Sequence, residues 1–261
     1  MGTIFRTFLV SGFRDGYLLF WSIVFPIGLL LGLGYYFDSP GYREQLLVAT
    51  VSMSVLFGAC ITTAFFIMWH RNRGVYKLLR ATPVSTVQFV LAFSLARTVI
   101  MLLVGLVIWF TGTVVFGISL TWPAFLLVLT VLALGTLCFT CLSFFIANFA
   151  RNEAQTSMIS NLLSLPMVFT SEAFYSLQNA PQWIQVIGKL MPFSYFVEAL
   201  LAAKQGEFME LYEPFLILLA FTVGILVLAV ATFRWDPDFS VIRLPIRGLA
   251  NNFTSGSYRQ Q

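Results

Sequence analysis

The fold class is decided by one long stretch of sequence without a charged side chain, TVIMLLVGLVIWFTGTVVFGISLTWPAFLLVLTVLALGTLCFTCLSFFIANFA (residues 98–150). A helix needs roughly 20 apolar residues to cross a hydrocarbon core about 30 Å thick. The stretch is long enough for two such helices, and the segment Gly117–Pro123 (GISLTWP) divides it because its glycine and proline favour a turn. These residues therefore predict two neighbouring membrane spans joined by a short loop.

Other uncharged runs continue this pattern over most of the chain. Of its 261 residues, 59% are hydrophobic and 10% are charged, and the mean hydropathy is +0.87, which excludes an ordinary soluble domain. The runs are too long and too unbroken for the strands of a barrel, so the predicted fold class is all-α and polytopic. We predict six transmembrane helices, at residues 17–37, 46–69, 86–116, 122–149, 154–172 and 214–233.

The remaining segments complete the predicted organisation of the chain. Residues 1–16 are expected to form an N-terminal segment at the cytoplasmic interface and residues 234–261 a cytoplasmic tail, so that the transmembrane domain occupies residues 17–233. The first apolar run is too long for a cleavable signal peptide, and no small-residue cleavage site follows it. In residues 173–205, prolines and aromatic residues predict an extracellular re-entrant helix pair before the last span, at the depth where aromatic belts lie.

Charge asymmetry predicts that both termini are cytoplasmic. With residues 70–84 placed on the inside, the inner segments hold 11 Lys and Arg against 4 acidic residues, whereas the outer segments hold 3 against 7. Lys and Arg in short loops favour the cytoplasmic side, so this bias predicts an N-in, C-in topology. The net charge of +4 is then a consequence of topology, and no nucleic-acid partner is inferred from it.

The stretch HRNRGVYKLLRATPVS (residues 70–85) gathers bases in an otherwise apolar chain. Three of its apolar residues have the i, i+3, i+4 spacing of one helical stripe: Val75, Leu78 and Leu79. Three of its bases lie away from this stripe: Arg73, Lys77 and Arg80. Pro83 disfavours helix at Thr82, which can then cap the next helix with Pro83 at its first position. Spacing alone leaves two readings open, an interfacial helix on anionic lipid headgroups and a docking helix for a cytoplasmic partner.

Three places in the sequence resemble one family of membrane transport proteins. The first is the segment Phe5–Asp15, which leads into the first span. The second is RGVYKLLRATPVS (residues 73–85) with its Thr-Pro pair, and the third is LPMVFTSEAFYSL (residues 165–177), followed by Pro181 and Pro192. In this order, and with six spans, they are similar to the permease subunits of ATP-binding cassette (ABC) transporters of the type-2 exporter family. That family includes drug-resistance, polysaccharide-export and natural-product-export permeases.

The resemblance implies that residues 70–84 form a coupling helix that seats in a groove of a separate ATPase subunit. The residues that would make this contact are Arg71, Arg73, Val75, Tyr76, Leu78, Leu79, Thr82 and Pro83. It further implies a second permease copy, in a homodimer or a heterodimer, and ATPase subunits that bind ATP and Mg, whereas this chain itself binds no cofactor. These subunits and the membrane lipids are the expected partners, and a bacterial plasma membrane, crossed several times, is the expected location.

The same resemblance places a gate or translocation path around the outer end of the fifth span. The candidate residues are Pro166, Phe169, Glu172, Phe174 and, in the third span, Arg97. The family usually has glycine where this chain has Glu172, proline where it has Ser176, and an acidic residue where it has Asn72-Arg73. Two readings are open for Arg97, a base that snorkels to the inner headgroups and a residue that faces the translocation path.

No catalytic or metal site is predicted. The sequence has no GxxxxGK[ST] phosphate loop, and the CxxC spacing of Cys138 and Cys141 puts two small residues on one helix face. We therefore predict a permease that exports an amphipathic or hydrophobic substrate (a drug, an antibiotic, a lipid or a lipid-linked glycan), powered by ATP hydrolysis on a separate subunit. The alternatives are an ATP-independent channel or secondary carrier, which would need buried ionisable residues, and a membrane lipid enzyme, which would need a nucleophile or a metal cluster.

Overall fold

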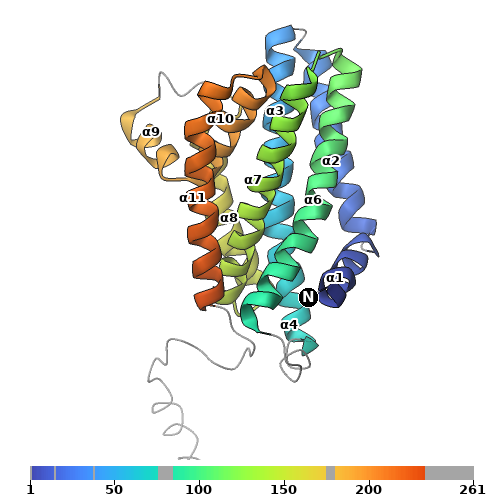
Figure 1. Cartoon of the computed structure of the whole chain (residues 1–261), viewed down its shortest axis with the longest axis vertical. Helices are drawn as coiled ribbons and strands as arrows, with labels where there is room; N and C mark the ends of the chain where they lie inside the picture. Colours follow the sequence, from blue (N-terminus) through green and yellow to red (C-terminus); the bar gives the residue numbers. More distant parts are fainter. Residues whose placement is uncertain (1, 15, 38, 76–84, 175–179, 233–261) are drawn as a thin grey trace, which may run out of the picture.

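The chain forms a bundle of helices that run roughly along one common direction (Figure 1). The computed structural model describes residues 2–14, 16–37, 39–75, 85–174 and 180–232. Within these residues every regular element is a helix, so the predicted all-α class is confirmed. Apolar runs fold this way because backbone groups in a bilayer must find their hydrogen-bond partners inside the protein, and a helix pairs them within its own segment.

Five helical segments of the described chain are long and apolar enough to cross a membrane. They are Leu19–Tyr36 in α2 (Gly16–Tyr36), a rod over Gly41–Asn72, α6 (Thr86–Phe116), α7 (Trp122–Phe149) and α11 (Phe208–Thr232). A bent pair, α9 (Gln182–Lys189) and α10 (Pro192–Gln205), raises this number to six if it is counted as one span. The predicted third and fourth spans agree with α6 and α7 residue for residue, and the last span begins earlier than predicted.

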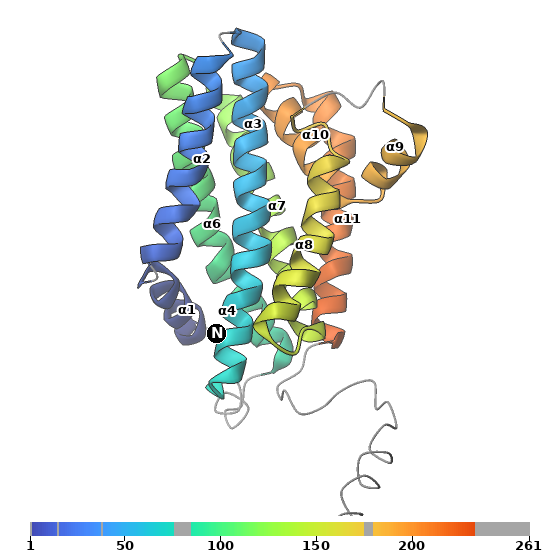
Figure 2. The same cartoon turned by 180° about the vertical axis from the view of Figure 1, so that it is seen from behind.

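The second span is a continuous rod built of three helical pieces. The helix α3 (Pro40–Leu56) passes without a break into a π-helical turn, η1 (Phe57–Thr62), and then into α4 (Thr63–Asn72). Most of the rod is buried, and α2, α6, α7, α10 and α8 (Glu153–Phe169) pack around it (Figure 2). The rod is therefore the central helical element of the bundle, and it runs from one end of the molecule to the other.

The predicted fifth span, residues 154–172, corresponds to α8, which ends already at Phe169. Its 17 residues are at the short limit of a spanning helix. The chain then turns into the bent pair, in which α9 and α10 meet at an angle of 83°. This pair lies within residues 173–205, where the sequence predicts a re-entrant helix pair, and Figure 1 shows α9 projecting from the side of the bundle.

The two ends of the described chain lie at the same end of the bundle (Figure 1). The helix α1 (Gly2–Arg14) packs against α6 at this end, and α11 also ends here, at Thr232. The end of α4 and the connection between α7 and α8 lie at the same end. We call it the inner end, following the charge-based prediction.

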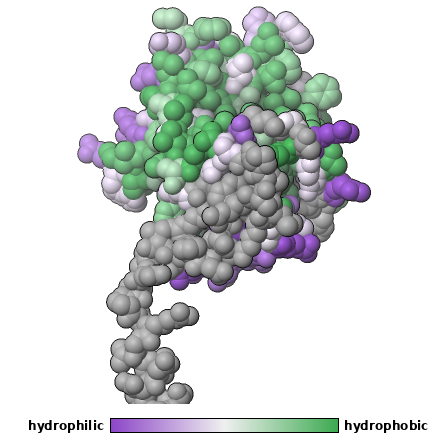
Figure 3. Space-filling view, turned by 60° about the horizontal axis from the view of Figure 1, so that its bottom comes forward, coloured by the Kyte–Doolittle hydropathy of each residue, from purple (hydrophilic) through white to green (hydrophobic). Residues whose placement is uncertain are grey.

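The side wall of the bundle is apolar, as expected of a surface that faces hydrocarbon. Figure 3, which turns the inner end toward the viewer, shows a largely hydrophobic wall and hydrophilic side chains along the rim of that end. Large apolar side chains remain exposed along the wall, among them Phe20 and Phe25 on α2, Phe110 on α6 and Val223 on α11. In water such a surface would promote aggregation, but in a bilayer it is solvated by lipid tails.

Helix caps define where α6 and α7 begin and end. The Ser85 hydroxyl accepts from the Gln88 backbone N–H at 3.3 Å, and the Gln88 side chain accepts from the Ser85 N–H at 3.4 Å, which forms a capping box. The prediction that Thr82 caps this helix is therefore wrong, because Ser85 is extended and the helix begins at Thr86. At the other end of α6, Gly117 adopts the left-handed conformation, and Thr121 then caps α7.

An aromatic cluster holds α1 against the inner part of the bundle. The ring of Phe8 is buried and lies 4.8 Å from the ring of Phe93 on α6, edge to face. Further rings pack around this pair: Phe66 on α4, Phe89 on α6 and Phe144 on α7. The N-terminal segment is thus an amphipathic helix docked on the second and third spans through its apolar face.

We predict that Gly135→Ala destabilises the bundle while Gly224→Ala does not. A Cβ atom at Gly135 would overlap the ring of Phe196, which is fully buried between α7 and α10, whereas a Cβ at Gly224 on α11 meets nothing within 4 Å. Overpacking of this kind costs about 1–3 kcal/mol. Thermal unfolding of the two variants in the same detergent measures the difference, and equal melting temperatures would contradict the close packing of α7 on α10.

Candidate functional site

The connection between α4 and α6, which we call the loop whatever its structure, contains the stretch that the family resemblance assigns to a partner. The helix α4 ends at Asn72, and Gly74 follows with a left-handed φ of 72°, which glycine adopts without steric cost. His70 and Arg71 therefore belong to the second span, and a separate coupling helix does not begin at residue 70. Five of the predicted contact residues lie outside the described residues: Tyr76, Leu78, Leu79, Thr82 and Pro83.

Arg71, which the resemblance places in the partner contact, points into the bundle. Its side chain is 5% exposed, and its two terminal nitrogens donate to the backbone carbonyl oxygens of Ala147 at 2.8 Å and Ala150 at 2.6 Å. Both carbonyls belong to the end of α7. We therefore correct the assignment of Arg71 to the docking surface, because a guanidinium that is buried in this way is closed to a partner.

Arg73 and Val75 take different positions from Arg71. The guanidinium of Arg73 lies 3.8 Å above the ring of Trp69, and both side chains are exposed at the inner end. A cation stacked on an aromatic face is held in place without being desolvated completely. Val75 is half-buried and packs against the aromatic cluster that holds α1. Of the predicted docking residues that the structure describes, only Arg73 is exposed.

Arg97 is buried between helices and does not snorkel to the headgroups. Its side chain is 3% exposed, its Nε donates to the Thr63 hydroxyl at 3.2 Å, and its guanidinium lies 5.0 Å from the centre of the Phe66 ring. The Thr63 hydroxyl in turn contacts the Gly58 carbonyl at 3.4 Å, inside the π-helical turn. Arg97 thus links α6 to the irregular turn of the rod, and a charged side chain inside a span usually faces such polar partners in the bundle interior.

The candidate gate residues around the end of α8 do not converge on one site. Phe169 is 62% exposed on the outside of α8, Pro166 is half-buried within the helix, and Phe174 packs on the main core. Glu172 lines a cavity of about 290 Å³ between the end of α8 and the bent pair. That cavity also contains Lys189 and Glu198. The outer end therefore holds a small charged cavity, and the gate assignment stays a prediction.

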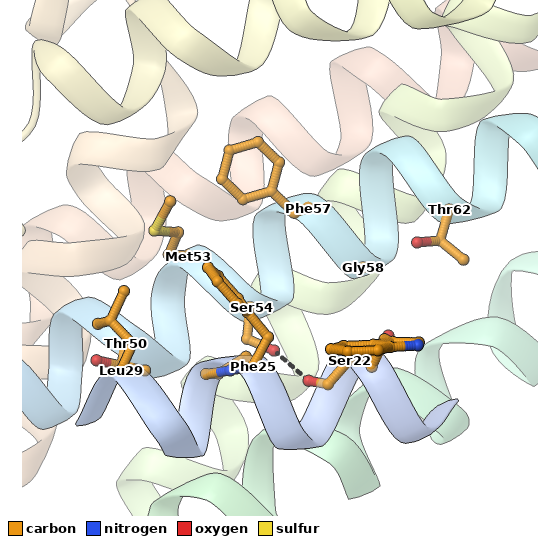
Figure 4. A pocket seen from close by; sticks show the side chains of 11 residues that line it. Ser22, Phe25, Leu29, Thr50, Met53, Ser54, Phe57, Gly58 and Thr62 are labelled. Atoms are coloured by element: carbon orange, nitrogen blue, oxygen red, sulfur yellow. Dashed lines mark hydrogen bonds between the residues drawn. The ribbon is translucent and has the colours of Figure 1, made fainter. Parts of the chain in front are cut away.

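A pocket that the sequence analysis did not anticipate lies between the first and second spans (Figure 4). Its volume is about 510 Å³, and its two walls are α2 and the α3–η1 part of the rod. The residues that line it are Trp21, Ser22, Phe25, Pro26, Leu29, Thr50, Met53, Ser54, Phe57, Gly58 and Thr62. The lining is mostly apolar, with a few hydroxyl groups and no charged side chain, which is the chemistry of a small-molecule site.

Irregular backbone on both sides explains why the two helices leave this space. Pro26 has no N–H, so the Ser22 carbonyl, four residues earlier, loses its helical partner. The Ser54 hydroxyl of α3 donates to this carbonyl across the pocket at 3.3 Å (Figure 4). On the other wall the π-helical turn widens the rod beside Phe57, and such turns are frequent at functional sites. A proline within an apolar run was the one available sequence signal for this pocket.

The fold and these sites define a multi-pass helical membrane protein with an apolar pocket between its first two spans. A family model for ABC-2 type transporters matches residues 2–204, which is most of the chain. The chain therefore belongs to the ABC-2 type transporter family and is a transmembrane permease, a domain that lacks the nucleotide-binding domain. A comparison with curated proteins found no match. The predicted family is thus confirmed, and permeases of this family generally pair with ABC ATPase subunits.

We predict that water reaches the pocket between α2 and the rod. Met53→Cys, on the pocket wall, should react with N-ethylmaleimide in native membranes because the reaction needs a hydrated thiolate. The fully buried neighbour Val51→Cys should stay unreacted, and the three native cysteines are buried and give a low background. Mass spectrometry of the labelled chain measures this, and a silent Met53→Cys would mean that lipid fills the pocket.

Proposed function

We propose that this chain is the membrane-spanning half of an exporter that carries an amphipathic or hydrophobic substrate, powered by ATP hydrolysis on a separate ATPase subunit. The observation that carries this proposal is the apolar pocket at membrane depth in a chain of the ABC-2 family. The family supplies the energy source, and the pocket supplies a surface on which a substrate can bind between two spans.

The lining of the pocket favours an uncharged, partly apolar substrate. Trp21, Phe25, Met53 and Phe57 offer apolar and aromatic surface, and the Thr50 hydroxyl is already engaged by the Leu46 carbonyl. A charged group would enter this space without an ionic partner, which is costly at membrane depth. Drugs, antibiotics and lipids with a small polar part fit this description, and they are the substrate classes that we propose.

An exposed face of α8 supports a second permease copy. The apolar side chains of this face are Met158, Leu162, Leu165 and Phe169. Asn161 is exposed among them, and its amide donates to the Ser157 hydroxyl at 3.3 Å. An amide in contact with lipid tails is unfavourable, so this face fits a protein neighbour or the edge of a translocation path better than bulk lipid. We propose that a second copy, the same or different, covers it.

The inner end is where we place the ATPase subunit. The charge-based prediction assigns most bases of the sequence to this side, and Arg73 stacks on Trp69 beside the start of the loop. In this arrangement the plasma membrane of a bacterial cell would hold the chain with both termini in the cytoplasm. ATP binding would bring the ATPase subunits together, and the loop after α4 would move with them.

The rod gives this movement a route to the pocket. The loop begins at the end of α4, and the same rod forms one wall of the pocket through η1 and α3. A tilt of the rod would therefore change the distance between the two pocket walls, as alternating access requires. Export rather than import follows from the family resemblance of the sequence and is part of the proposal.

The ATPase partner is tested by gentle purification of the tagged chain from its own membranes. We expect an ATPase with a phosphate loop to copurify with the wild type and to be lost from the double variant Leu78→Asp, Leu79→Asp, because both changes put charge on the apolar stripe of the loop. Leu190→Asp, at an exposed leucine of the outer end, is the control and should retain the partner. If no ATPase copurifies with the wild type, the carrier and enzyme alternatives regain support.

The pocket is tested by filling it. The measured quantity is the concentration of an uncharged amphipathic compound that gives half-maximal stimulation of ATP hydrolysis by the purified complex. Met53→Trp should raise this concentration about tenfold, which corresponds to ~1.4 kcal/mol. The added ring occupies space between α2 and the rod, and Leu216→Trp on the exposed face of α11 is the control. An unchanged response to every compound that stimulates the wild type would contradict a substrate site in this pocket.

A further inference from the structure

The last turn of α7 carries carbonyl groups that have lost their usual partners. In a regular helix the Ala147 carbonyl would accept from the N–H of Arg151, but this N–H donates instead to the Gln155 side chain at 2.9 Å. Ala150 is extended, with ψ 140°, and ends the helix. The carbonyls of Ala147 and Ala150 are therefore open to a donor from outside α7, at the negative end of the helix dipole.

Arg71 is that donor, and its planar guanidinium fits the site. One terminal nitrogen donates to Ala147 and the other to Ala150, at 2.8 and 2.6 Å. A guanidinium is a rigid fork that can hold two acceptors at once, which the single ammonium of lysine does less well. Buried, charge-assisted hydrogen bonds of this kind are strong, so the ends of α4 and α7 are held to each other firmly.

The backbone of Arg71 is at the same time the anchor of the loop. Its carbonyl accepts from the Gly74 N–H at 3.1 Å, and this bond closes the turn in which Gly74 takes its left-handed conformation. The loop that we assign to the ATPase is thus hydrogen-bonded to the backbone of Arg71, and the side chain of the same residue is hydrogen-bonded to the end of α7.

The end of α7 also determines where α8 begins. Only Arg151 and Asn152 separate Ala150 from α8, and the Asn152 side chain caps α8 by accepting from the Gln155 N–H at 2.8 Å. The helix α8 packs against η1 and α4, and it leads toward the cavity around Glu172 at the outer end. A displacement of the corner between α7 and α8 would therefore act along α8.

We propose that Arg71 is a positioning residue that transmits movement of the loop after α4 to the corner between α7 and α8. The inference rests on the proposed function, because it needs an ATPase that moves the loop. In this arrangement a movement of the loop reaches two helices. It reaches α6 because the chain continues from the loop into this helix, and it reaches α8 through Arg71. Without Arg71 the loop still binds the ATPase and still moves α6, but far less of the movement reaches α8.

The test measures the movement of each helix separately in the permease–ATPase complex, in lipid nanodiscs. Spin labels are placed on Glu153→Cys, in the first turn of α8, and on Val87→Cys, an exposed position in the first turn of α6, each paired with a label on the ATPase. Distances are recorded without nucleotide and with trapped ATP. In the wild type we expect nucleotide to change both distances, since the loop precedes α6 and Arg71 precedes the link to α8.

Arg71→Gln should separate the two movements. We expect the Val87 distance to respond to nucleotide as in the wild type, and the population of the nucleotide-dependent Glu153 distance to fall by about tenfold. The distances measured without nucleotide should stay unchanged. A variant that merely damages the structure would change these distances as well. A wild-type response of Glu153 in Arg71→Gln would overturn the proposal.

Two further variants make the result decisive. Arg43→Gln removes a similar contact at the opposite end of the bundle, where the Arg43 Nε donates to the Gly34 carbonyl at 2.9 Å, and it should leave both movements intact. If Arg71→Gln does not assemble, Arg71→Lys is used instead, because lysine keeps the positive charge but cannot hold both carbonyls as a guanidinium does. A wild-type response of the Glu153 distance in Arg71→Lys would then reject the proposal. If no ATPase binds the wild type, both the proposed function and this inference fail, and that outcome is recognised before any variant is made.

Discussion

A bilayer core contains no water, so every backbone N–H and carbonyl in it needs a partner inside the protein. The long helices of this chain meet the condition over most of their length, and the structure depends on how it is met where the helices are irregular. Pro26 leaves the Ser22 carbonyl without its helical donor, and the Ser54 hydroxyl replaces it. In the π-helical turn, the Thr63 hydroxyl contacts the Gly58 carbonyl, and Arg97 donates to Thr63.

These irregular places coincide with the sites to which we assign function. The Pro26 and η1 irregularities form the two walls of the pocket, because side-chain donors let the backbone depart from the regular helix without a lost hydrogen bond. The end of α7 follows the same rule, since Arg71 satisfies its open carbonyls and thereby joins α7 to the start of the loop. A buried arginine is costly in a membrane, and each of the two arginines that are buried in the described part of the chain is held by a polar contact between helices.

Several features were accessible from the sequence for physical reasons. Helical spans follow from uncharged runs because burial in hydrocarbon depends on composition and length, and α6 and α7 agree with prediction at both ends. Other features were not accessible, because helical spacing in a stretch rich in bases does not show which base faces inward. Arg71 belongs to the interior and Arg73 to the surface, although only Asn72 separates them.

The sequence by itself determined that this is a polytopic helical protein, roughly where its spans lie and which family its loop and proline motifs resemble. These properties are local, since each depends on the composition or order of residues close together in the chain. Only the tertiary structure decided that α2 and the rod enclose a pocket, that Arg97 supports η1, and that Arg71 grips α7. Those contacts join residues far apart in the chain, and they depend on how the helices pack, which no single apolar run encodes.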